Sequence, residues 1–209
     1  MRLKFYLAAS GTCEANGVVD LGIRRLSRPT FCLALVLAVA LLAACREPRY
    51  VIPVQKTAEE QYSFAVEQDN IYRMPINKDR QWPMSERAMA AYRKVIEEFP
   101  ENERLVNHSN LGIAMILDRR GDAFDRLRDK RGALKIYKRL LETCPDDDPI
   151  QINSLFGLAA IYDKMEKYET AKEYYRQLLD RFGEGKNPDF ERIVAISRLR
   201  YQKVHETKR

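Results

Sequence analysis

The sequence is poor in the residues that most catalytic and metal chemistry uses. Its 209 residues contain two histidines, four cysteines and one tryptophan, with nine glycines and nine prolines. His108 and His205 lie far apart and have no cysteine or carboxylate partner at metal-ligand spacing. No nucleophile-elbow, phosphate-loop or dinucleotide-binding pattern is present. We therefore expect no enzyme activity, no cofactor and no metal.

The chain also lacks an apolar run long enough to cross a bilayer. The longest, residues 31–44, has fourteen uncharged residues, whereas a membrane-spanning helix needs about 20. Three arginines shortly before it supply the positive flank of a secretory signal. The sequence thus predicts an export signal over residues 1–44. Residues 1–23 are unusual for a signal, and we interpret them as an extension from a start assigned too far upstream.

The predicted signal ends in the tetrapeptide Leu-Ala-Ala-Cys at 42–45. This resembles the lipobox of bacterial lipoproteins, in which the cysteine thiol forms a diacylglycerol thioether. The small residues before the cysteine give the lipoprotein signal peptidase an extended backbone to grip. The resemblance implies cleavage before Cys45 and acylation of this residue. The alternatives are a simple apolar anchor, or an ordinary signal with a chance cysteine at its end.

Removal of the signal changes the charge and the cysteine content. It leaves 31 basic and 28 acidic residues, which give no strong electrostatic footprint for nucleic acid. Cys13 and Cys32 leave with the signal, and Cys45 is expected to be acylated. Cys144 alone remains, so no internal disulfide is expected. Cys144 ends an apolar helical stripe and is predicted to be a packed residue.

The segment after the signal predicts a tether followed by a helix. Residues 45–56 contain two prolines, which favour an extended backbone, so we expect a free tether that holds the domain off the bilayer. Thr57 and Glu60 have the spacing of a capping box, which predicts a helix over 58–73. The next two prolines are expected to flank a loop that holds Trp82.

The rest of the chain contains an internal repeat. Stretches that begin at Ala88, Ala133 and Ala171 each place a tyrosine four residues later, an aliphatic residue three further on, and proline or glycine after another five. Residues 112–119 and 157–164 are similar at nearly every position. These patterns resemble the tetratricopeptide repeat, a helix–turn–helix unit of about 34 residues. The alternative is a generic helical bundle with ordinary core periodicity.

The resemblance implies an all-α fold, a short solenoid of antiparallel helix pairs closed by a C-terminal capping helix. The repeat region is expected at 57–186, with units at about 57–102, 107–147 and 152–185, and the capping helix and tail at 187–209. Asp148 and Asn187 each precede a proline and are expected to be helix N-caps.

The second unit departs from the family spacing. Seven more residues separate its small alanines, Ala114 and Ala133, than separate the corresponding pair of the third unit. Seven residues amount to about two extra helical turns, and we expect the charge-rich segment 119–132 to protrude between the paired helices. Gly121 matches the turn glycine of the family.

Tetratricopeptide arrays curve so that the first helix of each pair lines a concave groove for peptides or partner helices. Carrying the groove positions of the family over to this sequence predicts a protein-binding groove lined by His108, Leu111, Met115, Asp118, Arg119, Asn153, Phe156, Ala160, Asp163 and Lys164. The alternative is that many of these residues pack against neighbouring helices.

The two resemblances together imply a non-catalytic scaffold that faces the periplasm and binds another envelope protein or peptide. Lipoproteins of this build are similar to the tetratricopeptide subunit of outer-membrane β-barrel assembly and to pilus-secretin pilotins. Arg46, in place of an aspartate after Cys45, favours the outer membrane. One alternative is an accessory module that binds peptidoglycan or another envelope polymer, for which Phe156 is the clear aromatic candidate. The other is an enzyme with an unrecognised cluster of carboxylates.

Overall fold

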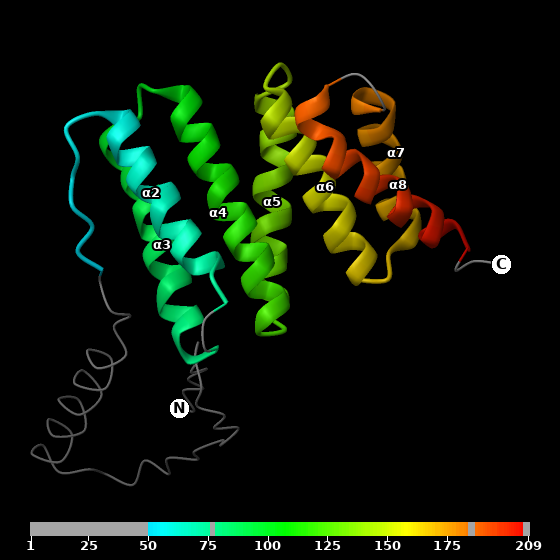
Figure 1. The fold of residues 1–209 in the computed structure, drawn as a ribbon, viewed down its shortest axis with the longest axis horizontal. Coiled ribbons are helices and arrows are strands. Elements are labelled where there is room, and N and C mark those ends of the chain that lie inside the picture. Colours follow the sequence, from blue (N-terminus) through cyan, green and yellow to red (C-terminus); the bar gives the residue numbers. More distant parts are fainter. Residues whose placement is uncertain (1–49, 76–77, 184–186, 207–209) are drawn as a thin grey trace, which may run out of the picture. The chain divides into compact units, whose positions relative to one another are not determined.

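The computed structural model describes residues 50–75, 78–183 and 187–206, and these form helices joined by short connections (Figure 1). The predicted signal and Cys45 lie outside the described residues. No helix among the described residues is long and apolar enough to cross a membrane. The helices are α2 Ala58–Arg73, α3 Lys78–Glu98, α4 Glu103–Ala123, α5 Leu127–Thr143, α6 Asp148–Lys164, α7 Tyr168–Phe182, the 3-10 turn η1 Pro188–Phe190 and α8 Glu191–Glu206.

Successive helices pack as pairs. The pairs are α2 with α3, α4 with α5 and α6 with α7, and α8 packs against α7 at the C-terminal end (Figure 1). The first helices of the pairs, here called the A helices, also contact one another in the order α2, α4, α6 and α8. The second helices make no comparable contacts with each other in the described part of the chain. The predicted all-α solenoid with a C-terminal capping helix is confirmed.

The repeated alanine, tyrosine and aliphatic positions form the core. Each falls on the second helix of a pair, where four-then-three spacing places the three side chains on one helix face. The nine side chains are at most 3% exposed: Ala88, Tyr92, Val95, Ala133, Tyr137, Leu140, Ala171, Tyr175 and Leu178. The internal repeat thus corresponds to a repeated core layer. Cys144 is a free and buried thiol at the end of α5, as predicted.

Where one unit contacts the next, here called a joint, a glycine of the new A helix packs against a tyrosine ring of the preceding pair. A Cβ added at Gly112 of α4 would lie 2.5 Å from the ring of Tyr92. A Cβ added at Gly157 of α6 would lie 2.5 Å from the ring of Tyr137 in the same way. Both tyrosines are buried, so their rings have little room to move away. Glycine therefore lets each new A helix approach the preceding pair closely.

The start of α2 carries the predicted capping box. The Thr57 hydroxyl accepts a hydrogen bond from the Glu60 backbone N–H at 3.2 Å. The Glu60 carboxylate accepts the return bond from the N–H of Lys56, one residue before the cap, at 3.2 Å. The Gln55 N–H donates to Gln61 Oε1 at 2.8 Å, which ties the preceding segment to the helix. The predicted helix over 58–73 is confirmed.

Of the other two predicted N-caps, one is shifted by one residue and one is as predicted. The N-cap of α6 is Asp147 instead of Asp148, because the Asp147 carboxylate accepts from the Ile150 N–H at 3.0 Å. The following proline lies in the first turn, where its missing N–H is not needed. Asn187 caps η1 as predicted, accepting from the Asp189 N–H at 2.9 Å.

The segment before α2 lies on the first helix pair and is not a free tether. Ile52 packs against the core between α2, α3 and α4. Burial raises the pKa of Tyr50, and the Glu86 carboxylate acts in the same direction. Figure 1 shows the cyan segment running alongside the first pair. Residues 50–56 therefore belong to the folded unit, in contrast to the expected extended spacer over 45–56.

The extra residues of the second unit lengthen its two helices. Helix α4 continues to Ala123 and α5 begins at Leu127, so the expected charged protrusion over 119–132 is wrong. Seven residues correspond to about two helical turns, and here they continue regular helix on both sides of a short connection. Gly121 lies inside α4, not in the turn, and a Cβ there would lie 2.7 Å from Cγ of Lys130. This glycine allows the lengthened helices to stay in contact.

Candidate protein-binding face

The ten predicted groove residues lie on two neighbouring A helices, five on α4 and five on α6. Leu111 and Ala160 are only 7% and 4% exposed, so their main role is packing. The other eight are half-buried or exposed. We refer to the surface formed by the A helices α2, α4, α6 and α8 as the A-helix face.

Charged residues of this face pair from one A helix to the next. Arg119 of α4 donates to Asp69 of α2 at 2.6 Å, and Asp69 also binds Arg73 at 2.5 Å. Lys164 occupies the position of Arg119 one unit later and forms an ion pair with Asp122 of α4. These pairs hold neighbouring units in register. Much of the charge that the family resemblance assigned to ligand binding is therefore neutralised within the chain.

Asp118 is a half-buried carboxylate of the face. Its Oδ1 atom is buried and has no hydrogen-bond partner among the described residues. Burial raises the pKa of Asp118 to about 6, although nearby Lys164 acts in the opposite direction. Lys130 and Arg119 also lower this pKa, while Asp122 raises it. Ionisation of Asp118 is therefore less favourable in the folded protein than in the unfolded chain.

Replacing Asp118 by asparagine is expected to stabilise the protein at pH 8 by about 1–3 kcal/mol. The unfolded chain releases this proton near pH 4, whereas the folded protein keeps it up to about pH 6. The free-energy cost of ionising Asp118 in the folded protein therefore grows between about pH 4 and pH 6. The stabilisation by Asp118→Asn should vanish below pH 4. Urea unfolding at pH 4, 6 and 8 measures it. Asp163→Asn, at the same position of α6, is the control and should change stability by less than about 0.5 kcal/mol. An Asp118→Asn benefit that is equal at all three pH values would contradict the argument.

The remaining half-exposed residues of the face are largely aromatic. The ring of Tyr62 on α2 lies edge-on to the ring of His108 on α4, with centroids 6.3 Å apart. His108 Nε2 lies 3.1 Å from Oδ2 of Asp147, the N-cap of α6. Farther along, the guanidinium of Arg200 on α8 lies 5.5 Å from the ring centroid of Phe156 on α6. Aromatic and arginine side chains of this kind are enriched in the energetic centres of protein interfaces.

The other predicted residues make few contacts across the face. Met115 packs partly against the core between α4, α5 and α6. The Asn153 amide donates to the carbonyl of Pro149 in its own helix at 2.8 Å. Asp163 makes no ion pair with another described residue. Asn153 and Asp163 are therefore available to a partner without the loss of an ion pair or hydrogen bond between helices.

Tyr62 and Arg200 belong to this face but were not predicted. Tyr62 lies three residues before the buried Ala65, just as Phe156 lies three residues before Ala159. Extending the repeat register to the first unit would have found it. Arg200 has no such signal, because the capping helix does not carry the repeat pattern. Its position over Phe156 follows only from the packing of α8.

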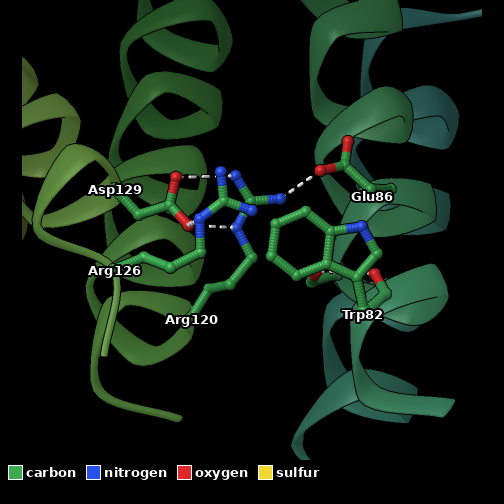
Figure 2. A network of polar contacts seen from close by, with 6 residues as sticks. Trp82, Glu86, Arg120, Arg126 and Asp129 are labelled. Carbon is green, nitrogen blue, oxygen red and sulfur yellow. Dashed lines mark hydrogen bonds and ion pairs between the residues drawn. The ribbon is translucent and has the colours of Figure 1, made fainter. Parts of the chain in front are cut away.

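A second polar cluster joins the start of α3, the end of α4 and the start of α5 (Figure 2). Arg120, only 6% exposed, donates to both oxygens of Asp129 at 2.7 and 3.0 Å and forms an ion pair with Glu86. Its guanidinium lies 4.2 Å from the ring centroid of Trp82, and that of Arg126 lies 4.5 Å from it. Trp82 is inside α3, so the expected loop around it is wrong. Helix α3 begins at Lys78, before Trp82, and places the indole against this cluster.

Neither group of residues has the composition of a metal centre. Among the described residues, no group of three or more histidine, cysteine, aspartate or glutamate side chains could hold a metal ion. The Arg120 cluster is saturated by its own ion pairs and stacking contacts. The A-helix face is therefore the better candidate for recognition.

Comparison with known families agrees with this geometry. Residues 116–147 and 152–182 each match a tetratricopeptide repeat family. The first match begins inside α4 and covers α5, and the second lies within α6 and α7. The chain therefore carries tetratricopeptide repeats, which indicate a protein–protein interaction scaffold. No curated protein and no solved structure matches the chain.

Proposed function

We propose that this chain is a lipid-anchored, non-catalytic scaffold of the bacterial cell envelope. It is exported and acylated at Cys45, it faces the periplasm from the outer membrane, and its A-helix face binds another envelope protein or peptide. The tetratricopeptide repeats carry the scaffold part of the proposal. The tetrapeptide 42–45 and the positively flanked apolar run before it support the anchor.

The partner is expected to contact the aromatic part of the face. The charges of Arg119 and Lys164 are already paired inside the chain, so a ligand that used them would have to break those pairs first. Tyr62 and Phe156 are half-buried and take part in no such ion pair, whereas His108 lies beside Asp147 at the N-cap of α6. A partner helix or peptide with apolar side chains and a few polar groups suits this surface.

Phe156→Ala is expected to lower the capture of a defined protein partner at least tenfold in crosslinking pull-downs from membranes of the native host, as for an aromatic residue at the centre of an interface. Arg176→Ala, at an exposed position of α7, is the matched control and should retain capture. Phe156 also packs against Tyr175, so folding of each variant is checked by circular dichroism. Phe156→Leu keeps the apolar volume and should retain part of the capture.

The outcome that overturns the scaffold proposal is equal capture by wild type and Phe156→Ala, or capture of a sugar polymer without any protein. The polymer reading requires an open aromatic ring face, and Arg200 lies over the ring of Phe156. The anchor is tested separately, because the mass of the N-terminal peptide reports acylation of Cys45. An unmodified cysteine would remove the anchor from the proposal and leave the scaffold intact.

A further inference from the structure

One end of the domain combines exposed apolar and basic side chains. It is formed by the C-terminus of α2, the start of α3 and the connection between α4 and α5. We call it the arginine end and define it by Met74, Arg80, Leu127, Arg128 and Arg131. Met74 and Leu127 are 57% and 46% exposed, among the most exposed large apolar side chains of the described residues, and all three arginines are exposed.

The connection between α4 and α5 is rich in basic residues. Residues 119–131 contain six basic and three acidic residues, and two of the basic residues, Arg119 and Arg120, pair with the carboxylates of Asp69 and Glu86 outside this segment. One of the three carboxylates, Asp129, is buried against Arg120, and a second, Asp122, pairs with lysines. Arg128 and Arg131 make no ion pair with another described residue. The exposed charge of this end is therefore predominantly positive.

The chain enters the fold close to the same end. Residues 50–57 run from the start of α2 back along the first helix pair, toward the end at which α2 ends and α3 begins (Figure 1). In this part of α3, Glu86 pairs with Arg120 in the cluster around Trp82. Along α3, Arg80 is six residues before Glu86, which corresponds to roughly 9 Å. Cys45 is five positions before Tyr50, so a fully extended chain between them spans at most about 18 Å. A lipid on Cys45 would hold this end near the headgroups.

We infer that the arginine end docks on anionic phospholipid headgroups next to the anchor. The inference rests on the proposed acylation of Cys45, which supplies the proximity. Arg80, Arg128 and Arg131 contact lipid phosphates, and Met74 and Leu127 enter the interfacial region. Each basic residue near an anionic surface strengthens membrane binding about fivefold. Docking at this end leaves the A-helix face in contact with the periplasm and fixes its orientation.

The single tryptophan is a built-in reporter of this contact. Trp82 lies at the start of α3, beneath Arg126 and against the ring of Phe124, 5.4 Å away between centroids. The mature chain, purified from membranes, is reconstituted into vesicles of phosphatidylcholine alone or with one third phosphatidylglycerol. Both preparations contain lipids brominated on the upper acyl chain. Trp82 fluorescence should be quenched more strongly in the anionic vesicles, and the difference should disappear at high salt, which screens exposed charges.

Arg128→Glu with Arg131→Glu is expected to abolish the extra quenching. The control is Arg176→Glu with Arg192→Glu, at exposed positions of α7 and α8. It makes the same change in net charge and should behave as wild type. The two α5 substitutions are also tested in a Cys45→Ala chain, which cannot be acylated at this position. Co-sedimentation of this chain with the anionic vesicles should fall about 30-fold or more when Arg128→Glu and Arg131→Glu are added, since two arginines are lost. Circular dichroism checks that each variant is folded.

The outcomes separate docking from anchoring. Equal Trp82 quenching in neutral and anionic vesicles, or in wild type and the α5 double variant, overturns the docking inference even if Cys45 is acylated. Unmodified Cys45 overturns the anchor, and the co-sedimentation of the Cys45→Ala chain then decides on docking. If the α5 reversals instead abolish binding to a nucleic acid or a soluble acidic protein and leave vesicle contact unchanged, the arginine end serves that ligand and the inference is wrong.

Discussion

Arg120→Ala is expected to lower the free energy of unfolding by about 3–5 kcal/mol, as is usual when one partner of a buried ion pair is removed. The variant leaves Asp129, itself 4% exposed, without its bidentate partner and Glu86 without its ion pair. It also removes the cation stacked over the indole of Trp82. Arg126 lies 3.7 Å from the Asp129 carboxylate and compensates only in part. Urea denaturation followed by circular dichroism measures the loss.

The matched control for this experiment is Arg128→Ala. Arg128 lies in the same region of the chain, is exposed and makes no ion pair with another described residue, so its loss should change stability by less than about 0.5 kcal/mol. Arg120→Lys keeps the charge but cannot form the bidentate contact with Asp129, and it should rescue only part of the loss. A loss below about 1 kcal/mol for Arg120→Ala would mean that the cluster is not needed to hold α3, α4 and α5 together.

The Arg120 cluster also explains why this part of the fold could not be predicted. The segment around it is rich in charge, and such segments are ordinarily solvated. Two of its charges are instead buried because they pair with each other and with Glu86, which is 34 positions away from Arg120. Trp82 adds a stacking surface from a helix that two prolines seemed to exclude. A pattern within one segment does not reveal a partner on another.

The helix pairs could be predicted because each unit repeats one local rule. The spacing that begins at Ala133 puts the alanine, Tyr137 and Leu140 on one face of one helix, and it needs no information from distant residues. The candidate site was predicted less completely. The family register placed Arg119 on the correct helix face, but its pairing with Asp69 joins residues fifty positions apart. Which groove charges remain free therefore depends on contacts between units, which the register does not contain.

Gly157→Ala is expected to destabilise the protein by about 1–3 kcal/mol, the usual effect of overpacking a core. Intrinsic helix propensity acts in the opposite direction, since alanine is favoured over glycine inside a helix by about 1 kcal/mol. The clash dominates because the new Cβ would lie 2.5 Å from the ring of Tyr137, and this ring is only 2% exposed. The same argument applies to Gly112 and Tyr92 at the preceding joint. Chemical denaturation of both variants measures the effect.

Gly132→Ala separates the two contributions. Gly132 is also inside a helix, α5, but a Cβ there would meet only the tip of the Leu117 side chain at 3.3 Å. This variant should therefore be neutral or stabilised by up to about 1 kcal/mol. A double-mutant cycle then identifies the cause, because Gly157→Ala should destabilise a Tyr137→Leu background less than it destabilises the wild type. If its effect is the same in both backgrounds, the tyrosine ring does not set the joint between units, and the close approach of α6 to α5 must have another origin.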